Sequence, residues 1–307
     1  MCNSRSPLRT PHLPIAVAWT AILAACVPAY AADPLPFWQG AITAVDRVAL
    51  SIDTTASGRV DFAGPNAVTC QALRVAQPGQ CSMPVIHLQE GRVGTSSSLD
   101  KFLHLYMGWL PTGLVPAAYA VDGLPDMSQY CLYRSVQCVS RALDVSRLQG
   151  ATTSRGVGIV AEGLGAFAAI TVAALRPDDI SFILLHQPTL AFPAGGNTNG
   201  SGSWLKGVLT ASTGLRPRAD LVDFDYLSVA PKVRCPVLML YTKNDPQCPL
   251  LALNELYAAF KCPKDATCLN LSGHIPFSSV PNGQAIFADF TQQVLTNRFA
   301  SHLWSIR

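Results

Sequence analysis

Residues 156–166 read GVGIVAEGLGA, a short apolar run that leads into a glycine-lined turn and then into a long apolar segment. The whole stretch from 157 to 175 is apolar enough to suggest a membrane span, but Glu162, Gly163 and Gly165 interrupt it. A buried strand, a sharp turn and a buried helix explain this pattern better. The segment therefore predicts one strand–turn–helix unit of a sheet protein.

Similar units are expected on both sides of this segment. Strand-like runs that are almost continuously apolar alternate with helix-like runs, which predicts an α/β protein with a mostly parallel central sheet and helices on both faces. The expected strands are 42–52, 68–75, 84–88, 114–121, 156–161, 180–186, 236–241 and 267–271. The expected helices are 98–110, 130–148, 163–175, 250–260 and 283–298. Residues 32–307 are expected to form a single domain, with a lid-like insertion around 190–227 that is rich in Gly and Asn.

The composition excludes several classes of protein. The 307-residue chain is 49% hydrophobic and only 13% charged, against about 25% charged in an average globular protein. Disordered tails and coiled coils carry more charge than this. With 22 Lys and Arg against 19 Asp and Glu, the net charge is only +3. Such a weak charge does not indicate nucleic-acid binding.

The first 31 residues are typical of a secretory signal. Arginines precede an apolar stretch at 13–25 that is shorter than the roughly 20 residues a membrane span needs. Ala29 and Ala31 suit signal peptidase, so we expect cleavage before Ala32 and export to the periplasm or the medium. The four residues that end at Cys26 also resemble a bacterial lipobox. The alternative is therefore a lipoprotein, attached to a membrane only through a lipidated Cys26.

The cysteines predict disulfides rather than a metal site. The exported part would contain an even number of cysteines, which is typical of disulfide-bonded secreted chains. The pairs Cys70/Cys81 and Cys262/Cys268 are close enough in sequence to bridge a turn. No C-x-x-C pair is present, so a zinc cluster is not expected. There is no phosphate-binding glycine motif either, and no cofactor is expected.

Three segments together resemble a known enzyme family. Residues 156–166 are similar to a strand and nucleophile elbow, residues 224–249 to the strand that precedes a catalytic acid, and 272–274 (Ser-Gly-His) to the site of a catalytic histidine. In this combination the chain, from Tyr133 onward, resembles the acetyl xylan esterase/cephalosporin-C deacetylase family of α/β-hydrolases. The resemblance implies the α/β-hydrolase fold and a site for cleaving carboxylic esters.

The elbow itself departs from the family pattern. In Gly-x-Ser-x-Gly the serine takes a strained conformation between strand and helix, and small flanking residues let the backbone approach closely. Ala161 and Gly165 supply the small flanks, which places Gly163 at the nucleophile position. Making Glu162 the nucleophile instead would put larger side chains at both flanks. The serine hydroxyl is therefore missing from the turn, while the amide of Leu164 remains as a candidate oxyanion donor.

The other two members of a catalytic triad are present. Asp245 follows a strand-like run, and His274 follows the last one beside a glycine. In the family arrangement the acid orients the histidine, which takes the proton of the nucleophile. The remaining histidines of the mature chain are interpreted as structural, namely His87, His104, His186 and His302.

A second departure concerns the oxyanion hole. The family has His-Gly followed by an aromatic residue after an early strand, and this chain has Glu90-Gly91-Arg92 at the equivalent place. Gly91 and Arg92 are thus oxyanion candidates with Leu164, but a carboxylate at Glu90 would repel a developing oxyanion. A shift of the alignment by one or two residues would make Glu90 a solvated loop residue instead.

These observations lead to two hypotheses of function. The first is an exported, catalytically inactive α/β-hydrolase-like protein with a binding or structural role and a small acylated or carbohydrate ligand. The alternative is an active carboxylic ester hydrolase, a deacetylase, that uses Asp245 and His274 with a non-standard nucleophile. Ser154, the serines at 96–98 and a water activated by His274 are candidates for that nucleophile.

Overall fold

A computed structural model describes residues 35–65, 69–75, 83–90, 102–108, 131–149, 156–189 and 226–300, all within one compact unit, Ala32–Arg307. The expected signal segment, residues 190–225 of the expected insertion, the expected strand at 114–121 and the candidate serines at 96–98 and 154 lie outside these residues. In the part of the chain that is described, every helix is too short or too polar to cross a membrane.

The described segments form strands and helices in the expected alternation over most of their length. The strands are β1 (Ile52–Thr54), β2 (Arg59–Ala63), β3 (Thr69–Val75), β4 (Met83–Gln89), β5 (Phe102–Gly108), β6 (Val157–Glu162), β7 (Ile180–His186), β8 (Val237–Tyr241) and β9 (Lys264–Cys268). The helices are α2 (Leu35–Asp46), α3 (Cys131–Gln149), α4 (Gly165–Leu175), α6 (Tyr226–Val229), α7 (Leu250–Ala259) and α8 (Gly283–Leu295), with 3-10 turns η6 (Ala230–Lys232) and η7 (Phe277–Ser279).

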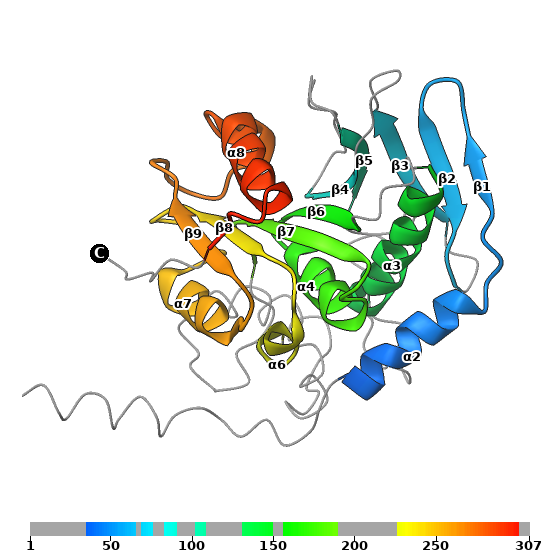
Figure 1. Ribbon diagram of the computed structural model, residues 1–307, viewed down its shortest axis with the longest axis horizontal. Coiled ribbons are helices and arrows are strands. Elements are labelled where there is room, and N and C mark those ends of the chain that lie inside the picture. Colours follow the sequence, from blue (N-terminus) through cyan, green and yellow to red (C-terminus); the bar gives the residue numbers. More distant parts are fainter. Residues whose placement is uncertain are drawn as a thin grey trace, which may run out of the picture. The chain divides into compact units, whose positions relative to one another are not determined.

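All the strands belong to one sheet, in the order β1-β2-β3-β5-β4-β6-β7-β8-β9. The first three pairings, β1 with β2, β2 with β3 and β3 with β5, are antiparallel. The remaining pairings, from β5 through β4 and β6 to β9, are parallel (Figure 1). The prediction of a mostly parallel sheet is confirmed.

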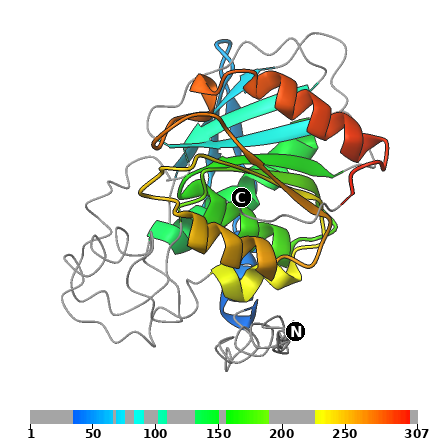
Figure 2. The same ribbon diagram turned by 90° about the vertical axis from the view of Figure 1, so that its left-hand side faces the viewer.

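Helices cover both faces of this sheet. Helix α8 packs on one face, and α2, α3, α4, α6 and α7 lie on the other, as two perpendicular views show (Figures 1 and 2). Alternate residues of each central strand enter different cores: Ile159 of β6 packs with the larger helical layer, whereas Val160 packs with α8. Burial on both faces explains why these strands are apolar without interruption.

The predicted strand at 42–52 is wrong, because its first half belongs to helix α2. The buried residues of α2 are Trp38, Ala41, Ile42 and Val45, which follow the i, i+3, i+4, i+7 spacing of a helix. A window that starts at residue 42 omits Trp38 and loses this period. Only Ile52, the first residue of the short edge strand β1, falls within the predicted range.

The predicted helix at 98–110 is also wrong, because residues 102–108 form strand β5. The helical spacing of Leu99, Phe102, Leu103 and Met107 had indicated a helix. All residues of β5 except the last are buried, so the strand lacks the alternation that distinguishes a half-exposed strand. The prediction for strand β9 is closer, because the strand lies three residues before the predicted range 267–271.

The cysteines with described surroundings carry free thiols, namely Cys70, Cys138, Cys235, Cys248, Cys262 and Cys268. The bridge between Cys262 and Cys268 that their close spacing allowed is not formed, because Cys262 precedes strand β9 and Cys268 is the last residue of that strand. A hydrogen bond with Cys70 and burial raise the pKa of the Cys138 thiol. The other predicted pair involves Cys81, which lies outside the described residues.

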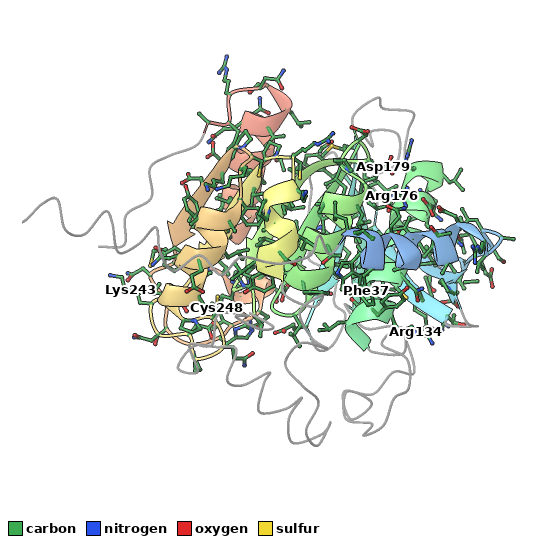
Figure 3. The ribbon with its side chains drawn as sticks, turned by 90° about the horizontal axis from the view of Figure 1, so that it is seen from below. Phe37, Arg134, Arg176, Asp179, Lys243 and Cys248 are labelled. Carbon is green, nitrogen blue, oxygen red and sulfur yellow. The ribbon has the colours of Figure 1, made fainter. Side chains whose placement is uncertain are left out.

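The amino and carboxyl edges of the parallel sheet carry different groups of residues. Asp179 and Arg176, which precede β7, form an ion pair at the amino edge. Lys243 and Cys248, which follow β8, lie at the opposite edge (Figure 3). Ligand sites of open α/β sheets form at the carboxyl edge, and the predicted site residues follow strands at that edge.

Candidate functional site

Four residues converge at the carboxyl edge of the sheet, each just beyond a parallel strand. Glu90 follows β4, Gly163 follows β6, and Asp245 and His274 follow β8 and β9. Adjacent strands β4 and β6 pair Leu88 with Ala161, so Glu90 and Gly163 occupy matching positions two residues further along. The sheet register therefore brings together residues that are far apart in the sequence.

Gly163 forms the sharp turn that the sequence predicted. Its φ is +49°, in the left-handed region where glycine is the least strained residue. Its N–H donates to the carbonyl of His186 at 3.0 Å, and its own carbonyl accepts from the N–H of Thr189 at 3.0 Å and of Ala166 at 3.2 Å. Helix α4 begins two residues later. This is the strand–turn–helix geometry of a nucleophile elbow, without a side chain at its apex.

Asp245 and His274 form the pair that the sequence predicted. Oδ2 of Asp245 lies 2.8 Å from Nδ1 of His274, and its Oδ1 accepts from the N–H of Gln247 at 2.8 Å. The Asp245 side chain is fully buried, and that of His274 is 18% exposed. The carboxylate is thus held by backbone on one side and orients the imidazole with its other oxygen.

The other ring nitrogen of His274 contacts Glu90. The sequence predicts that Glu90 lies beside the oxyanion hole but predicts no contact with the histidine. Oε2 of Glu90 lies 2.8 Å from Nε2 of His274, and Oε1 of Glu90 accepts from the N–H of Leu164 at 2.8 Å. A Cβ built on Gly163 would overlap the Glu90 carboxyl group. One carboxylate therefore fills the space of the missing serine side chain and also engages the predicted oxyanion donor.

Glu90 is consequently not a solvated loop residue, which was the alternative that a shifted alignment allowed. Its side chain is 25% exposed and has partners on two sides of the elbow. The predicted oxyanion residues Gly91 and Arg92 lie outside the described residues. Sequence reasoning identified the carboxylate beside Leu164 but missed its contact with His274, because that contact depends on how β9 ends relative to β4.

The two carboxylates determine the charge of the imidazole. Burial alone would lower the pKa of His274, but hydrogen bonds and charge interactions with Asp245 and Glu90 outweigh it and raise the pKa to about 9. The ring is therefore an imidazolium at neutral pH, donating from both nitrogens. An imidazolium has no free lone pair, so it cannot act as a general base in this state.

Two further titratable side chains, Glu162 and His186, interact electrostatically with His274. Burial raises the pKa of Glu162 to about 7, although a hydrogen bond from the Phe277 N–H opposes the shift and the nearby Glu90 adds to it. Burial and the positive His274 lower the pKa of His186 to about 3. Glu162 thus changes its charge near neutral pH, whereas His186 stays neutral there.

We predict that Glu162→Gln stabilises the protein above neutral pH. The folded-state pKa of about 7 exceeds the ordinary value of 4.5, so the unfolded chain ionises first and stability falls as pH rises from 4.5 to 7. The uncharged glutamine removes this loss, which amounts to at most about 3 kcal/mol. Urea unfolding at pH 8 should show the gain, and at pH 4.5 it should nearly vanish. Asp289→Asn removes the same charge from an exposed helix position as a control; a gain independent of pH would contradict the prediction.

Two of the other histidines interpreted as structural, His87 and His104, lie elsewhere in the sheet. Nε2 of His87 and Nδ1 of His104 are 2.7 Å apart on β4 and β5, and the His87 ring stacks on Tyr106. His302 lies outside the described residues. Within the described ranges, three or more His, Cys, Asp or Glu side chains are nowhere grouped so that they could hold a metal ion.

Comparison with known proteins identifies the fold. No protein-family model and no curated protein sequence matches the chain. Among solved structures, an acetyl xylan esterase from a Paenibacillus species matches with a TM-score of 0.67 at 18% identity, covering 85% of this chain and 94% of its own. The protein has the α/β-hydrolase fold.

Two other α/β-hydrolase-fold structures agree with this assignment. Acetyl xylan esterase 1 from a Thermoanaerobacterium species has a TM-score of 0.63 at 16% identity, covering 87% of this chain and 94% of its own. An S-formylglutathione hydrolase from Agrobacterium tumefaciens has a TM-score of 0.54 at 14% identity, covering 82% of this chain and all of its own. At these identities the similarity establishes the α/β-hydrolase fold, while activity has to be argued from the site.

Proposed function

We propose that this protein is an exported relative of the acetyl xylan esterases that has lost serine-type catalysis and keeps the site in a closed, ion-paired form. The observation that carries the proposal is the position of Glu90. Its carboxylate contacts both His274 and the Leu164 amide, which are the groups that a serine hydroxyl and an oxyanion would use. Export rests on the signal-like first 31 residues.

Two physical consequences argue against ester cleavage by the usual route. The turn offers no hydroxyl, since Gly163 has no side chain. The base is also unavailable, because an imidazolium between two carboxylates releases its proton only as the pH approaches about 9. A substrate carbonyl oxygen would in addition have to displace Oε1 of Glu90 from Leu164. These consequences favour a binding role for the site, with a small acylated or carbohydrate ligand at this edge.

One observation favours a second candidate, an ester hydrolase that uses Glu90 itself. Oε2 of Glu90 lies 2.8 Å from Nε2 of His274, at the place of a nucleophilic oxygen. In such a reaction Oε2 would bond to the acyl carbon, the ester C–O bond would break, and the imidazolium would protonate the leaving alkoxide. One water molecule would then cleave the mixed anhydride into the Glu90 carboxylate and the free acid. Its single oxygen would end up on whichever of the two carbonyl carbons it attacked, and His274 would take back one of the two protons released.

We predict that the purified protein hydrolyses neither aryl acetates nor acetylated xylan oligosaccharides above the buffer rate. A fluorophosphonate probe should label no serine. The same incubation in H₂¹⁸O, followed by mass spectrometry of the peptide that contains Glu90, should show no ¹⁸O incorporation. Turnover that disappears in His274→Ala would overturn the proposal, and ¹⁸O on Glu90 during that turnover would identify Glu90 as the nucleophile of the second candidate.

A further inference from the structure

The loop that carries His274 is held by a buried amide that neither function uses directly. Gln187 directly follows β7, has no exposed surface and has a φ of +44°. A non-glycine residue is uncommon in this left-handed region. The backbone N–H of Gln187 donates to the carbonyl of Leu240 in the neighbouring strand at 2.8 Å, so the residue is fixed to the sheet before its side chain makes any contact.

The side chain of Gln187 binds the backbone on both sides of His274. Its Nε2 donates to the carbonyl of Gly273 at 2.7 Å, and its Oε1 accepts from the N–H of Ile275 at 2.8 Å. These atoms belong to the two peptide groups that flank the Cα of His274. Because peptide groups are planar, holding both of them fixes the direction of the Cα–Cβ bond of the histidine.

Thr242, the residue directly after the adjacent strand β8, completes this arrangement. Its buried hydroxyl accepts from Nε2 of Gln187 at 3.0 Å and donates to the carbonyl of Gly273 at 2.9 Å. The carbonyl of Gly273 therefore receives two hydrogen bonds, and every polar atom of the Gln187 amide has a partner. A fully satisfied buried network of this kind specifies one geometry strongly.

We propose that Gln187 is the positioning residue of His274, which sets the imidazole between Asp245 and Glu90 by clamping its two flanking peptide groups to strand β7. The strained backbone at Gln187 persists because this network holds it. The clamp concerns the placement of the imidazole, so it applies to both candidate functions and does not depend on the absence of catalysis.

The test is the titration of the His274 ring, followed by NMR on the isotopically labelled full chain and assigned by the signal missing in His274→Gln. Gln187→Met removes all three amide contacts with an unbranched side chain of similar length. With the loop no longer clamped, the two ion pairs of His274 weaken, and its titration midpoint is expected to fall by at least about one pH unit, a tenfold change in proton affinity.

Matched variants separate positioning from general damage. Thr189→Val alters a fully buried side chain next to the elbow whose hydroxyl makes no hydrogen bond with the described residues, and it should leave the midpoint unchanged. Thr242→Val should lower the midpoint and Thr242→Ser should restore it, which decides the question if Gln187→Met does not fold. Folded variants of Gln187 and Thr242 that titrate like the wild type would overturn the clamp. A wild-type midpoint near 6.5 with shifts between variants would instead contradict the proposed closed site.

Discussion

Glu90→Ala combined with Gly163→Ser is expected to hydrolyse aryl acetates at least about 100-fold faster than either single variant, since a positioned nucleophile and base typically contribute 10²–10⁴-fold. The serine supplies the missing hydroxyl at the apex of the elbow. The alanine clears the space that the Glu90 carboxyl group occupies and frees the Leu164 amide for an oxyanion. It also removes one of the two carboxylates that keep His274 protonated.

Each single variant should remain inactive for a different reason. Gly163→Ser alone places the serine Cβ where the Glu90 carboxyl group lies. Either the Glu90 side chain or the turn must then move, so the serine is not held in the geometry that the reaction needs. Glu90→Ala alone has no nucleophile. A non-glycine residue at φ +49° also costs about 1–2 kcal/mol of stability, so the double variant should unfold at lower urea concentration than Glu90→Ala.

The matched control for this experiment is Glu90→Ala with Gly163→Ala. It has the same cavity and the same backbone strain but no hydroxyl, so any rate it shows does not come from the serine. Adding His274→Ala to the double variant should abolish the activity. If the serine and alanine versions hydrolyse equally slowly while both are folded, the retained Asp245 and His274 are not aligned for catalysis, and descent from an active triad loses its support.

The sequence allowed prediction of those features that depend on chain order alone. Gly163, Asp245 and His274 each follow a strand, and parallel strands end at the same edge, so their convergence followed from the α/β pattern. Helix α2 and strand β5 were predicted as the opposite type, because a strand buried on both faces and an amphipathic helix viewed through a shifted window produce similar apolar runs.

The closed state of the site could not be predicted in the same way. Glu90 contacts His274, which lies 184 positions later in the chain. Whether a glutamate at the end of β4 points toward the elbow or into solvent depends on side-chain packing between β4, β6 and the loop after β9. Gln187 was missed for a related reason: a single glutamine after a strand resembles any polar loop residue until its partners at Gly273 and Ile275 are known.

His274→Ala is expected to destabilise the protein by about 3 kcal/mol at pH 7. This is the lower end of the roughly 3–5 kcal/mol lost when one partner of a buried ion pair is removed, because His274 and Glu90 are partly exposed. The variant leaves Asp245, which is fully buried, and Glu90, which is 25% exposed, without the cation between them. A histidine that serves only in catalysis gives the opposite result, because active-site residues often reduce stability. Urea unfolding of wild type and variant measures the difference.

The pH dependence of this stability loss tests whether the positive charge of His274 causes it. Its folded-state pKa is raised from 6.5 to about 9, so its ion-pair contribution is complete below pH 6.5 and is lost as the pH rises through 9. The stability difference between wild type and His274→Ala should shrink over that interval. In a Glu90→Gln background the cost of removing His274 should be smaller, since only one carboxylate remains to be compensated. A His274→Ala variant as stable as the wild type at pH 7 would show that the carboxylates do not need the imidazolium, and the closed ion-paired site would have to be abandoned.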